Sequence, residues 1–510
     1  FNLRGNQRTS GELSRKEGGK IFGSGSRTPI AITLLVKNPK QAGQKATIYY
    51  NDIGDYLTRE EKLTIVKKYA SIGNEAMKWK KLIPNEHGDW INPRNDSFDL
   101  FFEIGNKKSN KETLFNIYSS GVITNRNDWA YNFSKQKLID NVNSMIGFYN
   151  QQVNDYRKAI KTGETIAIDK FVSKDETKIK WDQGLMEDAS KLKHIDFDDK
   201  SVRMGLFRPF FKQIVYFDKS FNWSRYQLPS IFPIRLDRNL LICVSGPGTS
   251  KDFSVVMTDS IPDRDLNVHA QCFPLYYYEE RQKQSPDLFD TDGDSEYIQR
   301  DGVTDFILKR AKIMYGKAVN KEDIFYYVYG FLHSSEYRAM FANDLKKMLP
   351  RLPLIDNVRD FWKFSKAGRA LAELHINYES VPAYEGVKVT GSDSGFYKVE
   401  KMRFPQKNQK DTIIYNSKIT IENIPAKAYE YVVNGKSAIE WIIERYQITT
   451  HKESGITNDP NDWAQEMGNP KYILNLLLSI INVSVQTVNI AEGLPKNCLA
   501  TSSQNDQSNK

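Results

Sequence analysis

The chain has 510 residues, of which 40% are hydrophobic and 26% are charged, and this composition excludes a largely disordered protein. Its net charge of +9 favours an acidic partner, most often nucleic acid. The three cysteines are widely spaced and form no CxxC pair, which excludes a zinc ribbon or a disulfide scaffold and favours the reducing cytoplasm.

Most of the net charge lies in the first 45 residues, where nine Lys or Arg stand against two Glu, giving +7 of the total +9. This glycine-rich segment runs into Pro29–Val36, whose uniformly apolar sequence predicts a strand buried on both faces of a covered α/β sheet. A basic glycine loop beside such a strand is typical of proteins that approach phosphate groups. Because the chain opens at Phe1 without an initiator Met, we expect it to be a piece of a longer protein.

The rest of residues 1–115 also has an α/β pattern. We expect a short helix over Ser10–Phe22 and a strand over Ala46–Tyr50. A second helix is predicted over Thr58–Ile72, because Thr58 followed three residues later by Glu61 forms a capping box.

Residues 116–200 are predicted to be mostly helical. Over Ser134–Ile160 the apolar residues recur at helical spacing on an otherwise polar segment. A long helix with few turn signals often connects two domains, so we interpret this region as a helical connector.

From residue 201 the pattern changes to short aromatic strands separated by Pro and Gly, with a helical block over 303–349. Strands are predicted at 213–217, 239–244, 272–278, 412–415 and 418–422. The apolar stretch Tyr472–Val488 is interrupted by polar residues and predicts a buried helix rather than a membrane span. Residues 491–510 are polar enough for a flexible tail.

No motif indicates catalysis, a metal or a nucleotide cofactor. Gly435–Ser437 has the end of a phosphate loop but lacks the glycine five residues earlier, and Gly246–Gly248 lacks the third glycine of a dinucleotide site. Asp290–Glu296 imitates a calcium loop but carries Ser295 where glycine is required, so an exposed acidic loop is favoured. We therefore expect no catalytic, metal-binding or cofactor-binding residue in this chain.

Polar and basic residues on predicted turns are the candidates for contact with DNA. Asn125 and Arg126 have side chains suited to bidentate contacts with base edges, although a capped helix start with Trp129 in the core explains the same turn equally well. Near the predicted strand ends, cations and amides lie among aromatic residues that are mostly expected in the core. The candidates there are Arg208, Arg225 and Gln227.

Several stretches resemble the C-terminal part of the single-chain Type ISP restriction–modification enzymes, in family order over nearly the whole chain. They include NLRGNQRTSGE, GGKIFGSGSRTPIAITLLVKNP, SSGVITNRNDWAYNFS, FRPFFKQIVYFD, QLPSIFP, AQCFPLYYYE, YVYGFLHSSEYR, LPRLPLI and YVVNGKSAIEWIIERYQITTHKESGITNDPNDW. The family's polypeptides join a nuclease, a helicase-like ATPase, a coupler, an adenine-N6 methyltransferase and a target-recognition domain.

The resemblance implies an α/β region followed by an α+β region. Residues 1–115 would be the last strands of a Rossmann-like methyltransferase sheet, 116–200 the helical connector, 201–490 a mixed target-recognition domain and 491–510 the tail. The full-length enzyme would use S-adenosylmethionine, ATP and Mg. This sequence lacks the glycine loop for S-adenosylmethionine and the Asn-Pro-Pro-Tyr motif, so no catalytic residue is carried over.

Our first hypothesis is sequence-specific recognition of duplex DNA, with a target adenine extruded toward the methyltransferase. The basic first segment would hold phosphates, which positions DNA without specifying its sequence; its candidate residues are Arg4, Arg8, Arg15, Lys20 and Arg27. Further partners would be the N-terminal methyltransferase, ATPase and nuclease domains, in the cytoplasm and without a membrane. The alternatives are an active enzyme in longer form, and a protein that binds single-stranded DNA or RNA without specificity.

Overall fold

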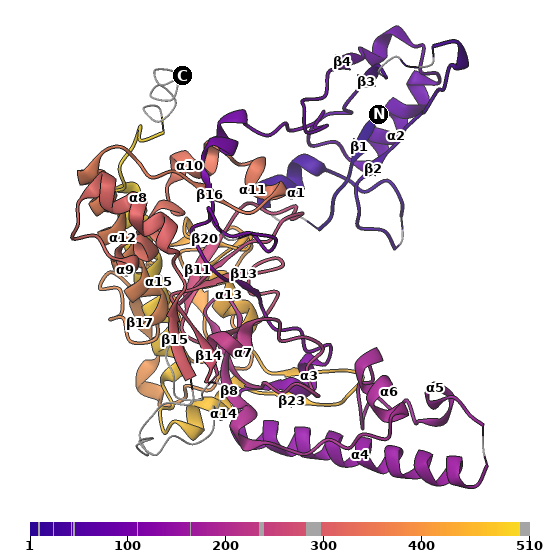
Figure 1. Ribbon diagram of the computed structural model, residues 1–510, viewed down its shortest axis with the longest axis vertical. Coiled ribbons are helices and arrows are strands. Elements are labelled where there is room, and N and C mark those ends of the chain that lie inside the picture. The colour runs from indigo at the N-terminus through magenta and orange to yellow at the C-terminus, as the bar shows by residue number, and fades with distance from the viewer. Residues whose placement is uncertain are drawn as a thin grey trace. The chain divides into compact units, whose positions relative to one another are not determined.

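The computed structural model describes residues 1–499 except 9–10, 24, 42, 44–45, 110, 164, 234–238 and 282–296. The chain divides into two compact units, Phe1–Asn95 and Asp96–Lys510, drawn in indigo and in violet to yellow (Figure 1). The loop Asp290–Glu296 falls outside the described residues, and so do residues 500–510 of the expected tail.

Within its described residues the first unit contains two antiparallel strand pairs and two α-helices. β1 pairs with β2, and β3 pairs with β4. The bounds are β1 (Asn2–Arg4), α1 (Gly11–Glu17), β2 (Ile30–Ala31), β3 (Ile48–Tyr50), α2 (Arg59–Tyr69) and β4 (Lys80–Leu82).

The two helices and the strand at 48–50 confirm the sequence predictions in shortened form. At α2 the Thr58 side chain accepts a hydrogen bond from the Glu61 backbone N–H, and the Glu61 carboxylate accepts one from the Thr58 backbone. The predicted capping box is therefore present in full.

The prediction of a buried strand over Pro29–Val36 is wrong for this chain. Only Ile30–Ala31 pair as a strand, and the exposed fraction rises from 51% at Ile32 to 88% at Leu35. The apolar sequence has no covering layer within the described residues, so the pattern of a central strand is present without the neighbours that would bury it.

The second unit is built around two four-stranded sheets. One has the order β11-β10-β13-β6 and is antiparallel; the other has the order β12-β8-β9-β7, in which β12 and β8 are parallel. Their bounds are β6 (Ser119–Ser120), β7 (Tyr131–Asn132), β8 (Val202–Arg208), β9 (Phe211–Tyr216), β10 (Leu241–Val244), β11 (Val255–Thr258), β12 (Ile261–Pro262) and β13 (Gln271–Pro274).

The sheet that contains β10 separates two hydrophobic cores. Leu241 and Cys243 belong to one core, whereas Ile242 and Val244 belong to the other. Because alternate side chains of a strand point to opposite faces, a strand covered on both faces is apolar at every position. The predicted strand over 239–244 is thus confirmed as a central strand.

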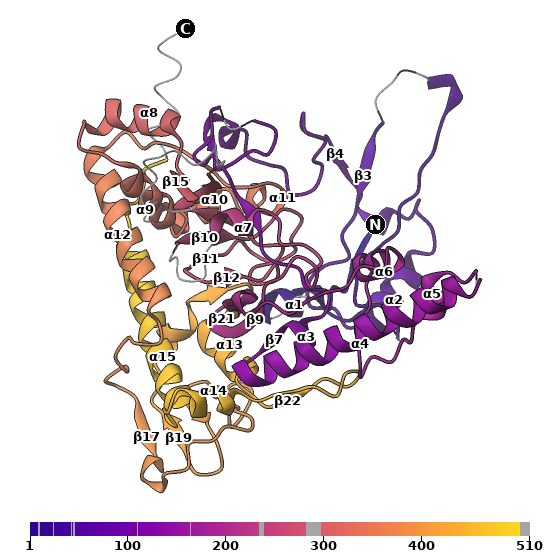
Figure 2. The same ribbon diagram turned by 60° about the horizontal axis from the view of Figure 1, so that its bottom comes forward.

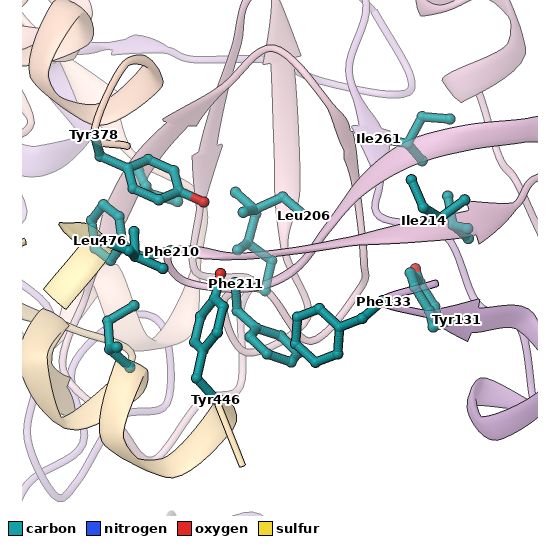
Figure 3. Close-up of a cluster of buried hydrophobic side chains, with 14 of the residues drawn as sticks. Tyr131, Phe133, Leu206, Phe210, Phe211, Ile214, Ile261, Tyr378, Tyr446 and Leu476 are labelled. Atoms are coloured by element: carbon teal, nitrogen blue, oxygen red, sulfur yellow. The ribbon is translucent and has the colours of Figure 1, made fainter. Parts of the chain in front are cut away.

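Aromatic rings fill much of the core beside β9. Phe211 packs edge-on against Phe133 with ring centroids 5.2 Å apart, and edge-on against Tyr446 at the same separation (Figure 3). These rings come from β9, from the residue after β7 and from the end of α13, so the core joins segments that are far apart in sequence.

Shorter strands complete the unit, including those predicted at 412–415 and 418–422 in shortened form, whereas the strand predicted over 272–278 is divided between β13 of the four-stranded sheet and β14. In one three-stranded sheet β19 (Thr420–Glu422) lies between β17 (Lys388–Thr390) and β18 (Ile413–Ile414). The two-stranded pairs are β5 (Phe102–Glu103) with β16 (Arg351–Leu352), β14 (Tyr276–Glu280) with β15 (Tyr297–Asp301), β20 (Val432–Val433) with β21 (Lys436–Ser437), and β22 (Thr449–Thr450) with β23 (Thr457–Asn458).

The helices form two groups. α4 (Lys135–Lys161) confirms the helix predicted over Ser134–Ile160, begins at the N-cap Ser134, and has α5 (Ile168–Phe171) and α6 (Gln183–Ser190) near its far end (Figures 1 and 2). The remaining α-helices of this unit form the second group, and the described residues also include six 3-10 turns. The α-helices are α3 (Asn127–Ala130), α5 (Ile168–Phe171), α6 (Gln183–Ser190), α7 (Leu228–Ile231), α8 (Asp305–Tyr315), α9 (Lys321–Phe331), α10 (Ser335–Met340), α11 (Asp344–Lys347), α12 (Val358–Ile376), α13 (Ala438–Arg445), α14 (Pro460–Glu466) and α15 (Tyr472–Glu492).

α15 is long and apolar enough to cross a membrane by length and composition, but 67% of its most apolar window is buried inside the protein. This confirms the prediction of a buried helix. Beyond α15, Leu494 and Leu499 are buried in the core that contains Ile242 and Val244. We call this the second core, and the part of the expected tail up to residue 499 is therefore anchored to it.

A buried histidine links α9, α12 and α15 and predicts acid sensitivity. His375 Nδ1 lies 2.5 Å from the Tyr329 hydroxyl, and His375 Nε2 lies 2.9 Å from Thr487 Oγ1. Burial, with a smaller effect of Arg338, lowers the pKa of His375 to about 3. The folded protein therefore keeps this ring neutral, whereas the unfolded chain takes up a proton below its ordinary pKa of about 6.5.

We expect the contribution of His375 to stability to be complete above about pH 6.5 and to fall by ~2 kcal/mol between there and about pH 5. Urea unfolding at the two pH values checks this, with His375→Gln as the comparison. Burial raises the pKa of Asp263 to about 6. Protonation of this carboxyl therefore stabilises the folded state below that pH, which is opposite to the effect of His375, but it does so equally in wild type and variant. An equal loss of stability in both proteins would contradict the assignment.

Candidate nucleic-acid interface

Two of the sequence-predicted sites lie side by side on loops that pair with each other. Ile123 and Ser224 exchange both backbone hydrogen bonds, at 2.9 and 3.0 Å. We call residues 121–127 and 222–227 the paired loops. Asn125 and Arg126 lie on one of them, and Arg225 and Gln227 lie on the other, so the fold brings together candidates about 100 residues apart.

The exposed side chains of the paired loops are polar and aromatic: Asn125, Asn127, Trp223, Tyr226 and Gln227. Asn125 has φ = 57° and Tyr226 has φ = 46°, a left-handed conformation that Asn tolerates but that is unusual for a bulky ring. The two aromatic residues were not among the predicted contacts. Their positions on either side of Arg225 were the only sequence signal that they could contact DNA. Large rings are usually buried, however, and their exposure cannot be read from the sequence.

A cleft of about 740 Å³ opens beside the second of these loops. Its walls come from the segment before β6, from β6 itself, from β14 and from the end of the paired loops. The lining residues are Asn106, Lys107, Lys108, Ser109, Asn116, Ile117, Tyr118, Ser119, Ser120, Tyr226, Gln227 and Tyr277. Of the predicted contacts, Gln227 lies here, and its backbone N–H donates to Ser119 Oγ at 3.1 Å.

Arg126 does not reach the surface, which corrects its assignment as a DNA contact. It is 1% exposed, and its Nη2 lies 2.5 Å from the Asp182 carboxylate. Its other donors bind the backbone carbonyls of Lys180 and Phe221. Burial lowers the pKa of Arg126, and Asp182 opposes that shift. Trp129 is also buried, so the alternative of a structural helix start describes this turn.

Arg208 and Arg225 are likewise held by the protein. Arg208 forms an ion pair with Asp263 at 2.7 Å and lies 4.0 Å from the Phe207 ring centroid. Arg225 donates to the Phe217 carbonyl at 3.4 Å and lies over the Phe217 ring, and burial lowers its pKa. Both are only partly exposed, so their first role is to fix strand ends.

The cations predicted in the first segment lie in the other unit. Arg8, Arg15 and Arg27 are exposed and Lys20 is half-buried. Arg4 forms ion pairs with Asp52, at 2.7 Å, and with Asp55, which leaves it less available for a phosphate than its exposed neighbours.

The described residues contain no group of three or more His, Cys, Asp or Glu that could hold a metal ion. Gly435–Ser437 forms a hairpin in which Ser437 caps α13 and Glu440 completes a capping box, so this tripeptide ends a strand pair and starts a helix. Gly246 and Gly248 lie in the loop that follows β10.

Residues 113–476 match the family model described as the Type ISP C-terminal specificity domain. The chain is also similar to solved structures of a nuclease-deletion mutant of the Type ISP restriction–modification enzyme LlaGI in complex with a DNA substrate mimic (42% identity, TM-score 0.84) and of the ATP-dependent Type ISP enzyme LlaBIII bound to DNA (37%, 0.85). A third similar structure is a DrdV–DNA complex (28%, 0.82).

In each comparison the match covers 97% of this chain, but it covers only 43%, 30% and 47% of the three solved chains. The chain thus spans less than half the length of these relatives. A comparison with curated proteins found no match.

Proposed function

Because the chain belongs to the family of Type ISP C-terminal specificity domains, we propose that it recognises a specific sequence of duplex DNA within a restriction–modification enzyme. The observation that carries this proposal is the pairing of the two loops, each of which presents an exposed amide side chain, Asn125 on one loop and Gln227 on the other. Amide side chains are suited to bidentate contacts with adenine. The DNA complexes of LlaGI, LlaBIII and DrdV support the choice of partner.

In this proposal the two units have different tasks. The exposed cations of the first unit hold phosphates, and the paired loops read base edges. The first unit would be the end of an adenine-N6 methyltransferase whose remaining strands cover Ile32–Val36. Residues 116–200 would connect it to a recognition domain over 201–490, and a target adenine would be extruded toward the methyltransferase.

The full-length cytoplasmic enzyme would use S-adenosylmethionine, ATP and Mg, together with its nuclease and ATPase domains. The described strands of the first unit are antiparallel pairs. They do not offer the carboxyl edge of a parallel sheet at which such α/β folds bind their cofactors. The residues present therefore do not fit S-adenosylmethionine, and no step is derived through it.

We expect Asn125→Gly, which removes the amide without straining the left-handed backbone, to change which duplex is preferred. Loss of one bidentate contact costs on the order of 1–3 kcal/mol against the preferred base at that position and little elsewhere. Selection of bound duplexes from a random pool, repeated with the variant, measures this. Arg27→Ala is the control, because loss of a phosphate contact should weaken all duplexes alike and reduce the salt slope by about 1. Equal losses on selected and scrambled DNA for Asn125→Gly would contradict the proposal.

The exposed rings of Trp223 and Tyr226 favour a second candidate, binding of single strands by stacking. Competition between duplex and single-stranded DNA of the same sequence at fixed salt separates the two. Preference for the single strand without sequence dependence would favour this candidate.

A further inference from the structure

The cleft beside the paired loops has the wrong shape for reading a DNA groove. Grooves are read by elements that protrude into them, such as a helix or a β ribbon. A concave site of about 740 Å³ instead lies within the range of pockets that enclose a small ligand. The ligand of this cleft is therefore expected to be a group that can leave the duplex stack.

Aromatic rings and cations line the cleft together. Tyr118 stacks on Phe273 with centroids 5.0 Å apart and planes 26° apart, which fixes its ring, and Lys107 Nζ lies 5.4 Å from the Tyr118 centroid. Tyr226 is 45% exposed and is held by a left-handed backbone. Lys108 is exposed on the same segment as Lys107. A fixed ring beside ammonium groups suits a planar base attached to a phosphate.

Polar groups in the cleft remain able to bind a base edge. The Nδ2 of Asn116 donates to the Asp301 carbonyl at 3.1 Å, which leaves its Oδ1 to accept. Gln227 is held through its backbone N–H, so its amide side chain can both donate and accept. The groups required by a nucleobase are thus adjacent to the rings that would stack on it.

We propose that this cleft binds a single unstacked nucleotide of the DNA strand, with its base against Tyr118 and Tyr226 and its phosphate beside Lys107 and Lys108. This rests on the proposed DNA recognition and adds a nucleotide held by the specificity unit itself. The site is separate from the base-edge contacts assigned to Asn125, because it requires one nucleotide to leave the duplex.

The test compares three duplexes of one sequence chosen by the selection experiment: fully paired, with one bulged 2-aminopurine nucleotide, and with an abasic nucleotide in the same bulge. We expect the wild-type chain to bind the 2-aminopurine bulge about tenfold more tightly than the abasic bulge, because stacking of one base contributes an effect of that order. The emission of 2-aminopurine should change on binding. Tyr226→Ala and the double variant Lys107→Ala/Lys108→Ala should each reduce the preference to about twofold or less.

Phe396→Ala is the matched control, since this ring is 42% exposed and does not line the cleft; it should keep the full preference. Thermal unfolding of each variant shows that it remains folded. Equal binding of the base-containing and abasic bulges, or a preference that survives in both cleft variants, would overturn the inference. If the random pool yields a defined sequence but the cleft shows no preference for the base, sequence recognition stands and the nucleotide site fails. If no sequence is enriched, the proposal of sequence recognition fails, whatever the cleft variants show.

Discussion

Replacement of Arg126 by Ala is expected to lower the free energy of unfolding by about 3–5 kcal/mol, because it leaves the Asp182 carboxylate buried without its partner. The Asp182 side chain is only 10% exposed. The same arginine also binds two backbone carbonyls that link the turn before α3 to residues 180 and 221. These carbonyls would lose their donors as well, which adds to the cost.

Urea unfolding of wild type and variant measures this difference. Asn125→Gly is the control, because Asn125 is exposed beside Arg126 and glycine accepts its left-handed backbone without strain; it should change stability by less than about 0.5 kcal/mol. Addition of Asp182→Asn to Arg126→Ala should recover part of the loss, since it removes the unpaired charge and keeps an acceptor for the Leu185 backbone N–H. A loss below about 1 kcal/mol in the single variant would show that the pair contributes little.

Gly368→Ala is expected to be the second most damaging change, with a loss of about 3 kcal/mol. A Cβ on Gly368 would lie 1.9 Å from the Tyr326 carbonyl oxygen, and a Cβ on Gly330 would lie 2.2 Å from the Phe364 carbonyl oxygen. α9 and α12 therefore pack with their backbones in contact, and the added methyl group would force them apart within the second core.

Gly147→Ala in α4 tests the explanation, because it makes the same substitution in a helix where the new Cβ meets nothing within 4 Å. Alanine is the better helix former, so this variant should be more stable by up to about 1 kcal/mol. Thermal unfolding of both variants gives the comparison. Similar small effects at the two positions would contradict the close approach of α9 and α12.

Local signals in the sequence were sufficient for many elements. The capping residues Thr58 and Ser134 mark where α2 and α4 begin, because a cap is satisfied by a backbone N–H only two or three residues away. The family resemblance was also available from sequence, and the family model confirms it. The role of each unit in DNA binding stays a prediction.

The sequence did not predict burial correctly where it depends on residues far away in the chain. Pro29–Val36 and Leu240–Val244 are both uniformly apolar, yet the first is largely exposed and the second is covered by two cores. Likewise, Asn125 and Arg126 are neighbours in the chain, but Arg126 is buried by contacts to residues 180, 182 and 221 while Asn125 remains at the surface.

The amino-acid sequence by itself determined the family, the basic first segment and the local starts of helices, since these depend on residues close together in the chain. Only the tertiary structure decided that the loops at 121–127 and 222–227 pair, that Arg126 and Arg208 serve the fold, and that a cleft lies beside Tyr226. The physical reason is that burial and side-chain proximity arise from contacts between residues far apart in the chain, 54 positions for Arg126 with Lys180 and 55 for Arg208 with Asp263, which no local pattern records.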